Sequence, residues 1–160
     1  MTGIILVIVG VLLAAAAALF VIFYGGDAYN AGNARAAAAT IVNMGENVQH
    51  AATLYRMQEG GEPVDLAALV EASYLSAPPE PGSLGKPSPR WRVMRPLGAE
   101  PVNAYVIDDM DEKVCREINR QTGHDDVVLE NQAVELGCTS GVAGMYFFAK
   151  VGQAGSATTP

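Results

Sequence analysis

The first 26 residues of the chain lack any charged side chain, and the first charge belongs to Asp27. The Lys or Arg residues that usually precede the apolar run of an export signal are therefore missing. Basic residues are also scarce overall, with 10 Lys and Arg against 17 Asp and Glu and a formal net charge of -7. This balance argues against nucleic acid as the main partner, because phosphate contacts need clustered basic side chains.

Cysteine and histidine are equally scarce, which limits metal and enzyme chemistry. The chain has two cysteines and two histidines, too few and too scattered for a zinc site. His50 and His124 have no Ser or Cys nucleophile beside them in a recognisable motif. We therefore expect no enzyme activity, no metal and no cofactor.

Acidic residues gather around position 110. The EF-hand spacing and its glycine are absent, so calcium binding is not the favoured interpretation. Acids at the start of a helix, where they suit the helix dipole, explain the cluster better. The residues are Asp108, Asp109, Asp111, Glu112, Asp125 and Asp126.

An apolar run from Ile4 to Tyr24 occupies the start of the chain. As a helix it would measure roughly 31 Å, about the hydrocarbon thickness of a bilayer. A plain signal anchor and a cleavable signal peptide both leave the missing basic region unexplained. A basic leader that has already been removed explains it, and Met1 would then be the processed N-terminus.

Small residues are frequent in this run and favour close packing against other helices, although alanine is also simply a good helix former. Gly25 and Gly26 follow, and a glycine weakens a helix by about 1 kcal/mol relative to alanine. We expect a joint there that loses regular helix in an assembled state. The positions expected to pack in a helical core are Gly3, Ile5, Gly10, Ala14 and Ala18.

A second, amphipathic stretch follows Asp27, which can cap a renewed helix. Apolar residues recur at spacings of three and four until Gly60 and Gly61, so the pattern predicts a helix with one face on a globular head. That face consists of Ala34, Ala37, Ala38, Ile41, Met44, Val48, Ala51, Ala52 and Tyr55.

The remaining residues predict a head of mixed structure. Residues 63–73 can form a short helix, whereas the density of Pro, Gly and Ser in 76–89 indicates an irregular loop rather than a strand. Alternation in 90–95 would place Trp91 and Val93 on one strand face and Arg90 and Arg92 on the other. The other expected elements are strands at 103–108, 126–131 and 144–151, and a helix at 111–123 with Val114, Cys115 and Ile118 facing inward.

These elements predict an α+β fold with a long N-terminal α-helix packed on a small antiparallel-sheet head. Because export favours oxidation, we expect a disulfide between Cys115 and Cys138, with two buried free thiols as the alternative. The expected parts are an apolar half-helix (1–26), an amphipathic half-helix (27–59), the head (60–152) and a flexible tail (153–160).

One basic, aromatic stretch stands out in this acidic chain. It could bind nucleic acid through phosphates and stacking, pair with the acidic surface of a neighbouring subunit, or form a solvated strand face. The net negative charge of the chain makes nucleic acid the least favoured of these three alternatives. The residues are Lys86, Arg90, Trp91, Arg92 and Arg95.

The order of parts carries a family resemblance. A small-residue apolar helix continues into an amphipathic helix, and a Tyr–Gly–Pro–Leu connector follows in LYRMQEGGEPVDLAALVEASYLSAPPEP (54–81). A strand-rich head with a late cysteine pair comes last. This order resembles that of bacterial type IV pilins and pilin-like proteins. The start with Met and the stretch VCREIN, with Cys115 and Asn119, resemble the type IVb branch.

The resemblance implies a mechanism and a set of partners. A prepilin peptidase would remove the leader and methylate the new N-terminus, and the subunit would wait in the inner membrane with its head in the periplasm. Assembly machinery would then build a helical homopolymer at the cell surface. Such an extracellular filament would serve adhesion, motility or uptake.

One position departs from the family. Most pilins carry Glu at the fifth mature position, where it pairs with a neighbour's terminal amine, and this chain has Ile5. A minor or tip pilin, or a type II secretion pseudopilin, is therefore an alternative. A monomeric, membrane-anchored periplasmic binding protein is the alternative of another class.

Overall fold

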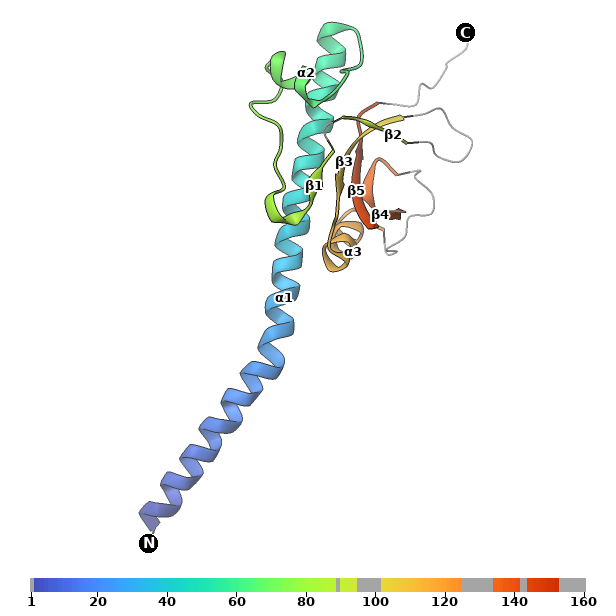
Figure 1. Ribbon diagram of the computed structural model, residues 1–160. Helices are drawn as coiled ribbons and strands as arrows, with labels where there is room; N and C mark the ends of the chain where they lie inside the picture. The colour runs from blue at the N-terminus through green and yellow to red at the C-terminus, as the bar shows by residue number, and fades with distance from the viewer. Residues whose placement is uncertain (1, 89, 95–101, 125–133, 142–143, 153–160) are drawn as a thin grey trace. The chain divides into compact units, whose positions relative to one another are not determined.

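The computed structural model in Figure 1 describes residues 2–88, 90–94, 102–124, 134–141 and 144–152, without the side chains of 2, 4–6 and 20–30. The chain is α+β, with one long helix and a small antiparallel sheet. It divides into two compact units, Met1–Ala34 and Arg35–Pro160.

The first unit consists of the early part of helix α1, which runs from Thr2 to Glu59. The helix passes through Gly25 and Gly26 without interruption. The joint expected at these glycines belongs to an assembled state, so it stays a prediction. Among the described residues, no helix has a stretch apolar and long enough to cross a membrane.

The second unit begins with the remainder of α1, and its apolar face is the one that the sequence predicts. Ala38, Ile41, Val48, Ala51 and Ala52 are buried. The helix ends at Glu59, and Gly60 follows with a φ of 73°, a left-handed conformation that glycine adopts at little cost. The expected apolar face and the glycine stop are therefore confirmed, but the helix is continuous through Asp27, so no renewed helix begins there.

Short helical elements follow the long helix. Helix α2 (Leu66–Glu71) starts after Asp65, whose Oδ1 accepts a hydrogen bond of 2.9 Å from the Ala68 amide. A single 3₁₀ turn, η1 (Gly82–Leu84), lies in the proline-rich stretch. The short helix is thus confirmed, and its extent is narrower than the 63–73 expected.

Within the described residues, five antiparallel strands form the sheet, and three of them lie where the sequence predicts strands. These three are β2 (Arg92–Met94), β3 (Val102–Asp108) and β5 (Gly144–Lys150). The sheet order is β1-β3-β5-β4, and β2 also pairs with β3. The strand expected at 126–131 and the tail at 153–160 lie outside the described residues.

Two strands correct the expectations. β1 (Lys86–Pro87) lies in the stretch expected to be only an irregular loop, and it pairs with the end of β3. β4 (Leu136–Gly141) was not expected at all, and it pairs along its length with β5. Both strands owe their position to a neighbour and not to their own composition, because Pro and Gly disfavour strands.

Strand β2 also presents its residues differently from the expectation of one apolar and one basic face. Val93 is 56% exposed, whereas Met94 is buried in a cluster with Ala104, Val106 and Phe148. Arg92 and Met94 alternate with Val93 and so share the cluster side of the strand. Arginine and methionine therefore occupy one face, since the guanidinium can reach solvent while the thioether packs.

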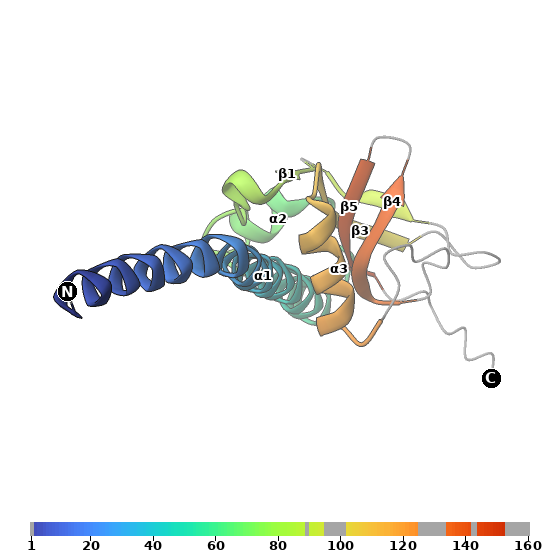
Figure 2. The same ribbon diagram turned by 90° about the horizontal axis from the view of Figure 1, so that it is seen from below.

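α1 and α3 (Glu112–Gln121) cover the same side of the sheet (Figure 2). Close contact between α1 and β5 depends on Gly45, because a Cβ there would lie 2.5 Å from Cζ of Phe147. α3 has the predicted inward residues, since Val114, Cys115 and Ile118 are all buried. One part of the head core therefore lies between these two helices and the sheet, and the Met94 cluster lies on the other face, because Phe148 alternates with Phe147 along β5.

Candidate functional site

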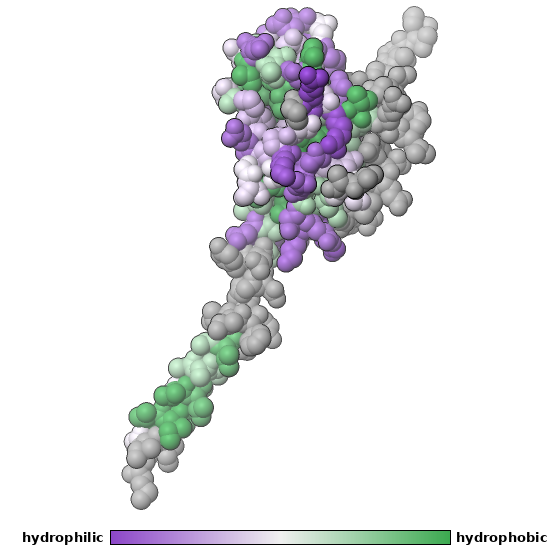
Figure 3. Space-filling view, in the orientation of Figure 1, coloured by the Kyte–Doolittle hydropathy of each residue, from purple (hydrophilic) through white to green (hydrophobic). Residues whose placement is uncertain are grey.

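The early part of α1 presents an unusual surface. Its large apolar side chains are 46 to 67% exposed, and the space-filling view shows them as a green band (Figure 3). Soluble proteins rarely expose so many large apolar groups together, so this surface calls for an apolar neighbour. The residues are Val7, Ile8, Val9, Val11, Leu12, Leu13 and Leu19.

The small residues expected to pack between helices lie within this surface. Nothing lies within 4 Å of a Cβ added at Gly3 or Gly10. Ala14 and Ala18 are exposed as well. The monomer therefore gives these positions no packing partner among the described residues, while the side chain of Ile5 and all of Met1 lie outside the description.

The basic stretch is largely paired within the head. Nζ of Lys86 lies 2.7 Å from Oδ2 of Asp109, and this hydrogen bond, followed by the charge of the carboxylate, raises the pKa of the amine. Nη2 of Arg92 lies 2.7 Å from Oδ2 of Asp108. The guanidinium of Arg92 also stands 5.4 Å above the ring centre of Tyr146.

The other three residues of the basic stretch differ in their surroundings. The indole Nε1 of Trp91 donates to the Pro63 carbonyl at 2.7 Å and so ties β2 to the connector after α1. Arg90 is exposed, and Arg95 lies outside the described residues. An interface with a neighbouring subunit at this stretch stays a prediction, and the two ion pairs above neutralise Lys86 and Arg92 within the head.

Four of the acidic residues around position 110 have a local role, and Asp125 and Asp126 lie outside the described residues. Besides the two pairs with basic residues, Oδ1 of Asp111 caps α3 by accepting from the amides of Lys113 at 2.8 Å and Val114 at 3.4 Å. Glu112 pairs with Arg116 one turn along the helix. Over the described residues, no three His, Cys, Asp or Glu side chains gather as a metal site.

The predicted disulfide between Cys115 and Cys138 is present and fully buried, with Cα atoms 5.4 Å apart. Asn119 lies beside it and is also fully buried. Its Nδ2 donates to the Cys138 carbonyl and its Oδ1 accepts from the Cys138 amide, both at 2.8 Å. The Asn119 side chain thus makes the two hydrogen bonds to Cys138 that a neighbouring strand would otherwise make.

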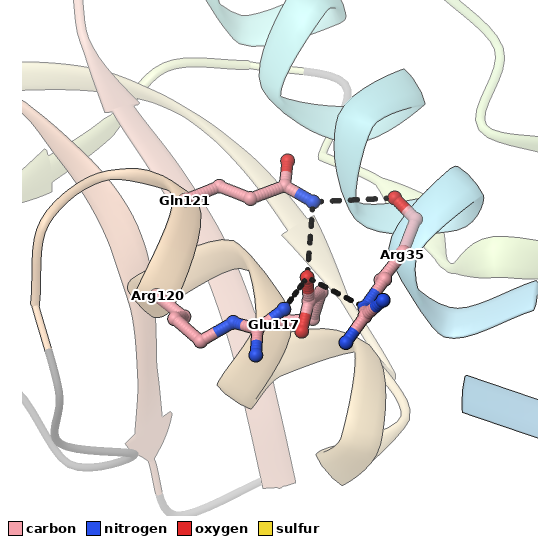
Figure 4. A network of polar contacts seen from close by, with 4 residues as sticks. All are labelled: Arg35, Glu117, Arg120 and Gln121. Carbon is pink, nitrogen blue, oxygen red and sulfur yellow. Dashed lines mark hydrogen bonds and ion pairs between the residues drawn. The ribbon is translucent and has the colours of Figure 1, made fainter. Parts of the chain in front are cut away.

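Side-chain contacts also tie α1 to the head. Nε2 of Gln49 donates to the carbonyls of Glu135 at 3.2 Å and Lys150 at 3.0 Å. Glu117 of α3 gathers the side chains of Arg35, Arg120 and Gln121 around one carboxylate oxygen (Figure 4). Sequence reasoning found neither contact, because partners 86 and 101 positions apart leave no local pattern.

Two shallow hollows border His50, with volumes of about 380 and 400 Å³. His124 lies elsewhere, and its Nδ1 is 3.2 Å from Oγ1 of Thr122. The structure therefore does not bring the two histidines together. No protein-family model, no curated protein and no solved structure matches this chain.

Proposed function

We propose that this chain is a structural subunit of an extracellular filament of the type IV pilus class, assembled through the early part of α1. The observation that carries the proposal is the run of exposed apolar residues between Val7 and Leu19 in that helix. The later part of the same helix packs on a disulfide-closed α+β head, which is the order of parts that the resemblance implies.

The size of the apolar surface supports assembly. Fully burying one Val, Leu or Ile side chain is worth about 1.5 to 3 kcal/mol in water. Seven such side chains are exposed here, which gives on the order of 10 kcal/mol before the entropic costs of association. If the subunit starts in lipid, the small residues at Gly3 and Gly10 become more important, because helices in lipid associate through close packing.

The proposal implies the partners and the location of the subunit before and after assembly. A prepilin peptidase and an inner-membrane assembly machine are the processing partners, and further copies of this chain are the structural partners. The subunit is held in the inner membrane before assembly and at the cell surface afterwards. Ile5 in place of the usual Glu favours a minor or tip subunit, or a pseudopilin, as the second candidate.

Negative-stain imaging of sheared surface material, labelled for this protein, tests the proposal. Labelled filaments are the expected result, and label at one filament end would favour the tip subunit. Sheared material without the protein, together with a monomer in the membrane fraction, would instead favour a membrane-anchored binding protein.

A pair of variants tests the packing surface. Gly10→Leu should reduce filament yield severalfold, because the small residue that allows close helix contact is lost. Val11→Leu is the matched control, since it changes a side chain that is already large and 64% exposed. Equal yields of filament from Gly10→Leu and the unaltered protein would remove the packing argument.

A further inference from the structure

Glu117 is the centre of a polar cluster between α3 and α1. Its Oε1 lies 2.6 Å from Nη2 of Arg120, 3.4 Å from Nε2 of Gln121 and 3.7 Å from Nε of Arg35. Nε2 of Gln121 also donates to the main-chain carbonyl of Arg35 at 3.3 Å. Figure 4 shows how the two α3 residues and Arg35 of α1 converge on the one carboxylate.

Burial distinguishes this carboxylate from its neighbours. The Glu117 side chain is 14% exposed, whereas that of Glu112 is 56% exposed and pairs only with Arg116 on the same helix. Two guanidinium groups share Glu117, so its loss would leave both without their acceptor. Charge-assisted bonds at a shielded carboxylate are stronger than those at an exposed one.

α3 is a firm support for this cluster. The disulfide joins Cys115 to β4, and Asn119 makes two hydrogen bonds to the same strand. Ile118, next to Glu117, is fully buried. The carboxylate therefore has a fixed position relative to the sheet, and α1 forms the other side of the cluster through Arg35.

Arg35 marks the start of the head-bound part of α1, since it is the first residue of the second compact unit. Ala36 is exposed, and the next fully buried residues along the helix are Ala38 and Ile41. Among the described polar contacts, those of Glu117 and Gln121 with Arg35 extend the head's hold on α1 by nearly one turn on the N-terminal side of Ala38.

We infer that Glu117 is a latch that sets where the head begins to hold α1. With the latch closed, the held part of the helix starts at Arg35. With it open, the held part starts at Ala38, and the turn between them is free to move with the residues that precede it. Because the Arg35 side chain is 61% exposed, salt can compete for it and open the latch.

Hydrogen exchange of the full chain in a mild detergent tests the latch, independently of any filament. In Glu117→Gln, amides in a peptide covering residues 33–40 should exchange about fivefold faster, in line with the loss of a partly shielded ion pair. Glu112→Gln is the matched control on the outer side of α3, and its exchange should equal that of the unaltered protein. An intact disulfide and unchanged protection of β3 and β5 show that the variant is folded.

Salt and a second variant complete the test. Raising NaCl from 50 mM to 1 M should accelerate exchange of the same peptide in the unaltered protein and in Glu112→Gln, but not in Glu117→Gln. Arg35→Gln should reproduce the effect of Glu117→Gln, and the double variant should be no faster than either. The latch is wrong if Glu117→Gln and Glu112→Gln behave alike, or if the loss of protection spreads through the sheet.

Discussion

Gly45 offers the sharpest test of how α1 packs on the head. A Cβ built on this residue would lie 2.5 Å from Cζ and 3.0 Å from Cε1 of Phe147, and 3.1 Å from Cδ1 of Leu136. Gly45 and Phe147 are both buried, so the ring has no solvent to move into. We expect Gly45→Ala to destabilise the head although alanine is the better helix former.

Two opposing effects set the change in unfolding free energy expected for Gly45→Ala. Replacing a helical glycine by alanine stabilises a helix by about 0.5 to 1 kcal/mol. Forcing an extra methyl group into a well-packed core costs typically 1 to 3 kcal/mol. Because one contact would be under 3.0 Å, we take the upper part of that range, and the net loss in unfolding free energy is about 1 to 2 kcal/mol.

Thermal unfolding of the full chain in mild detergent, followed by near-ultraviolet circular dichroism, measures this loss. For a domain of this size, 1 to 2 kcal/mol lowers Tm by about 3 to 10 °C. Gly32→Ala is the matched control, because Gly32 also lies in α1 and nothing is within 4 Å of its added Cβ. It should leave the Tm of the head unchanged or slightly raised.

A double-variant cycle decides whether the clash is the cause. Phe147→Leu shortens the side chain that Gly45 accommodates, so Gly45→Ala should cost less in that background by about 1 kcal/mol. A Tm for Gly45→Ala at or above that of the unaltered protein would refute the close approach. Equal costs in the two backgrounds would refute Phe147 as its partner.

Three further predictions concern the head. Replacing Cys115 and Cys138 together by serine should cost about 3 kcal/mol of unfolding free energy in a urea titration, because the bond closes a loop across 23 positions; an unchanged midpoint would contradict this. Asn119→Ala should cost about 2 to 4 kcal/mol in the same titration, since it strands two buried main-chain groups of Cys138, and a cost below about 0.5 kcal/mol would exclude that role. Burial raises the pKa of Tyr105 from 10.0 to about 12. The unfolded chain therefore loses this proton first, so stability should fall as pH rises from 10 to 12, and Tyr105→Phe should flatten that part of the pH profile.

Local patterns in the sequence were enough for the elements that bury a regular face. The spacing of Ala38, Ile41 and Val48 predicts the head-bound face of α1, and the spacing of Val114 and Ile118 predicts α3. Such periods report which side of an element is buried. The disulfide followed from a general link between export and oxidation, which does not depend on local pattern.

The missed elements depend on partners far away in the chain. LGCTSG, the sequence of β4, has few strand-forming residues, and it becomes a strand because β5 pairs with it on one side and α3 holds it on the other. Gly45 carries no signal in the sequence, and only the position of Phe147 explains why a glycine is needed there. Neither the pairing of β4 with β5 nor the contact of Gly45 with Phe147 produces a hydrophobic period in the sequence.

The basic stretch shows the same limit for charges. The sequence gives no sign that Lys86 and Arg92 are paired within the chain, because their partners Asp109 and Asp108 lie 23 and 16 positions later. Antiparallel pairing of β1 and β2 with β3 brings these charges together. A surface charge in sequence is therefore a poor guide to a docking site until the strand register is known.

Asn119 has a consequence for how copies of the head can meet. Among the described strands, β4 is the last on its side of the sheet, and a strand edge of this kind invites another chain to add itself there. At Cys138 both main-chain groups already bond to the asparagine of the same chain. An incoming strand would have to displace those bonds in a buried place. The two bonds from Asn119 therefore block strand addition between copies of the head at this residue. Reduction of the disulfide between Cys115 and Cys138 would loosen α3 from β4 and so weaken this block.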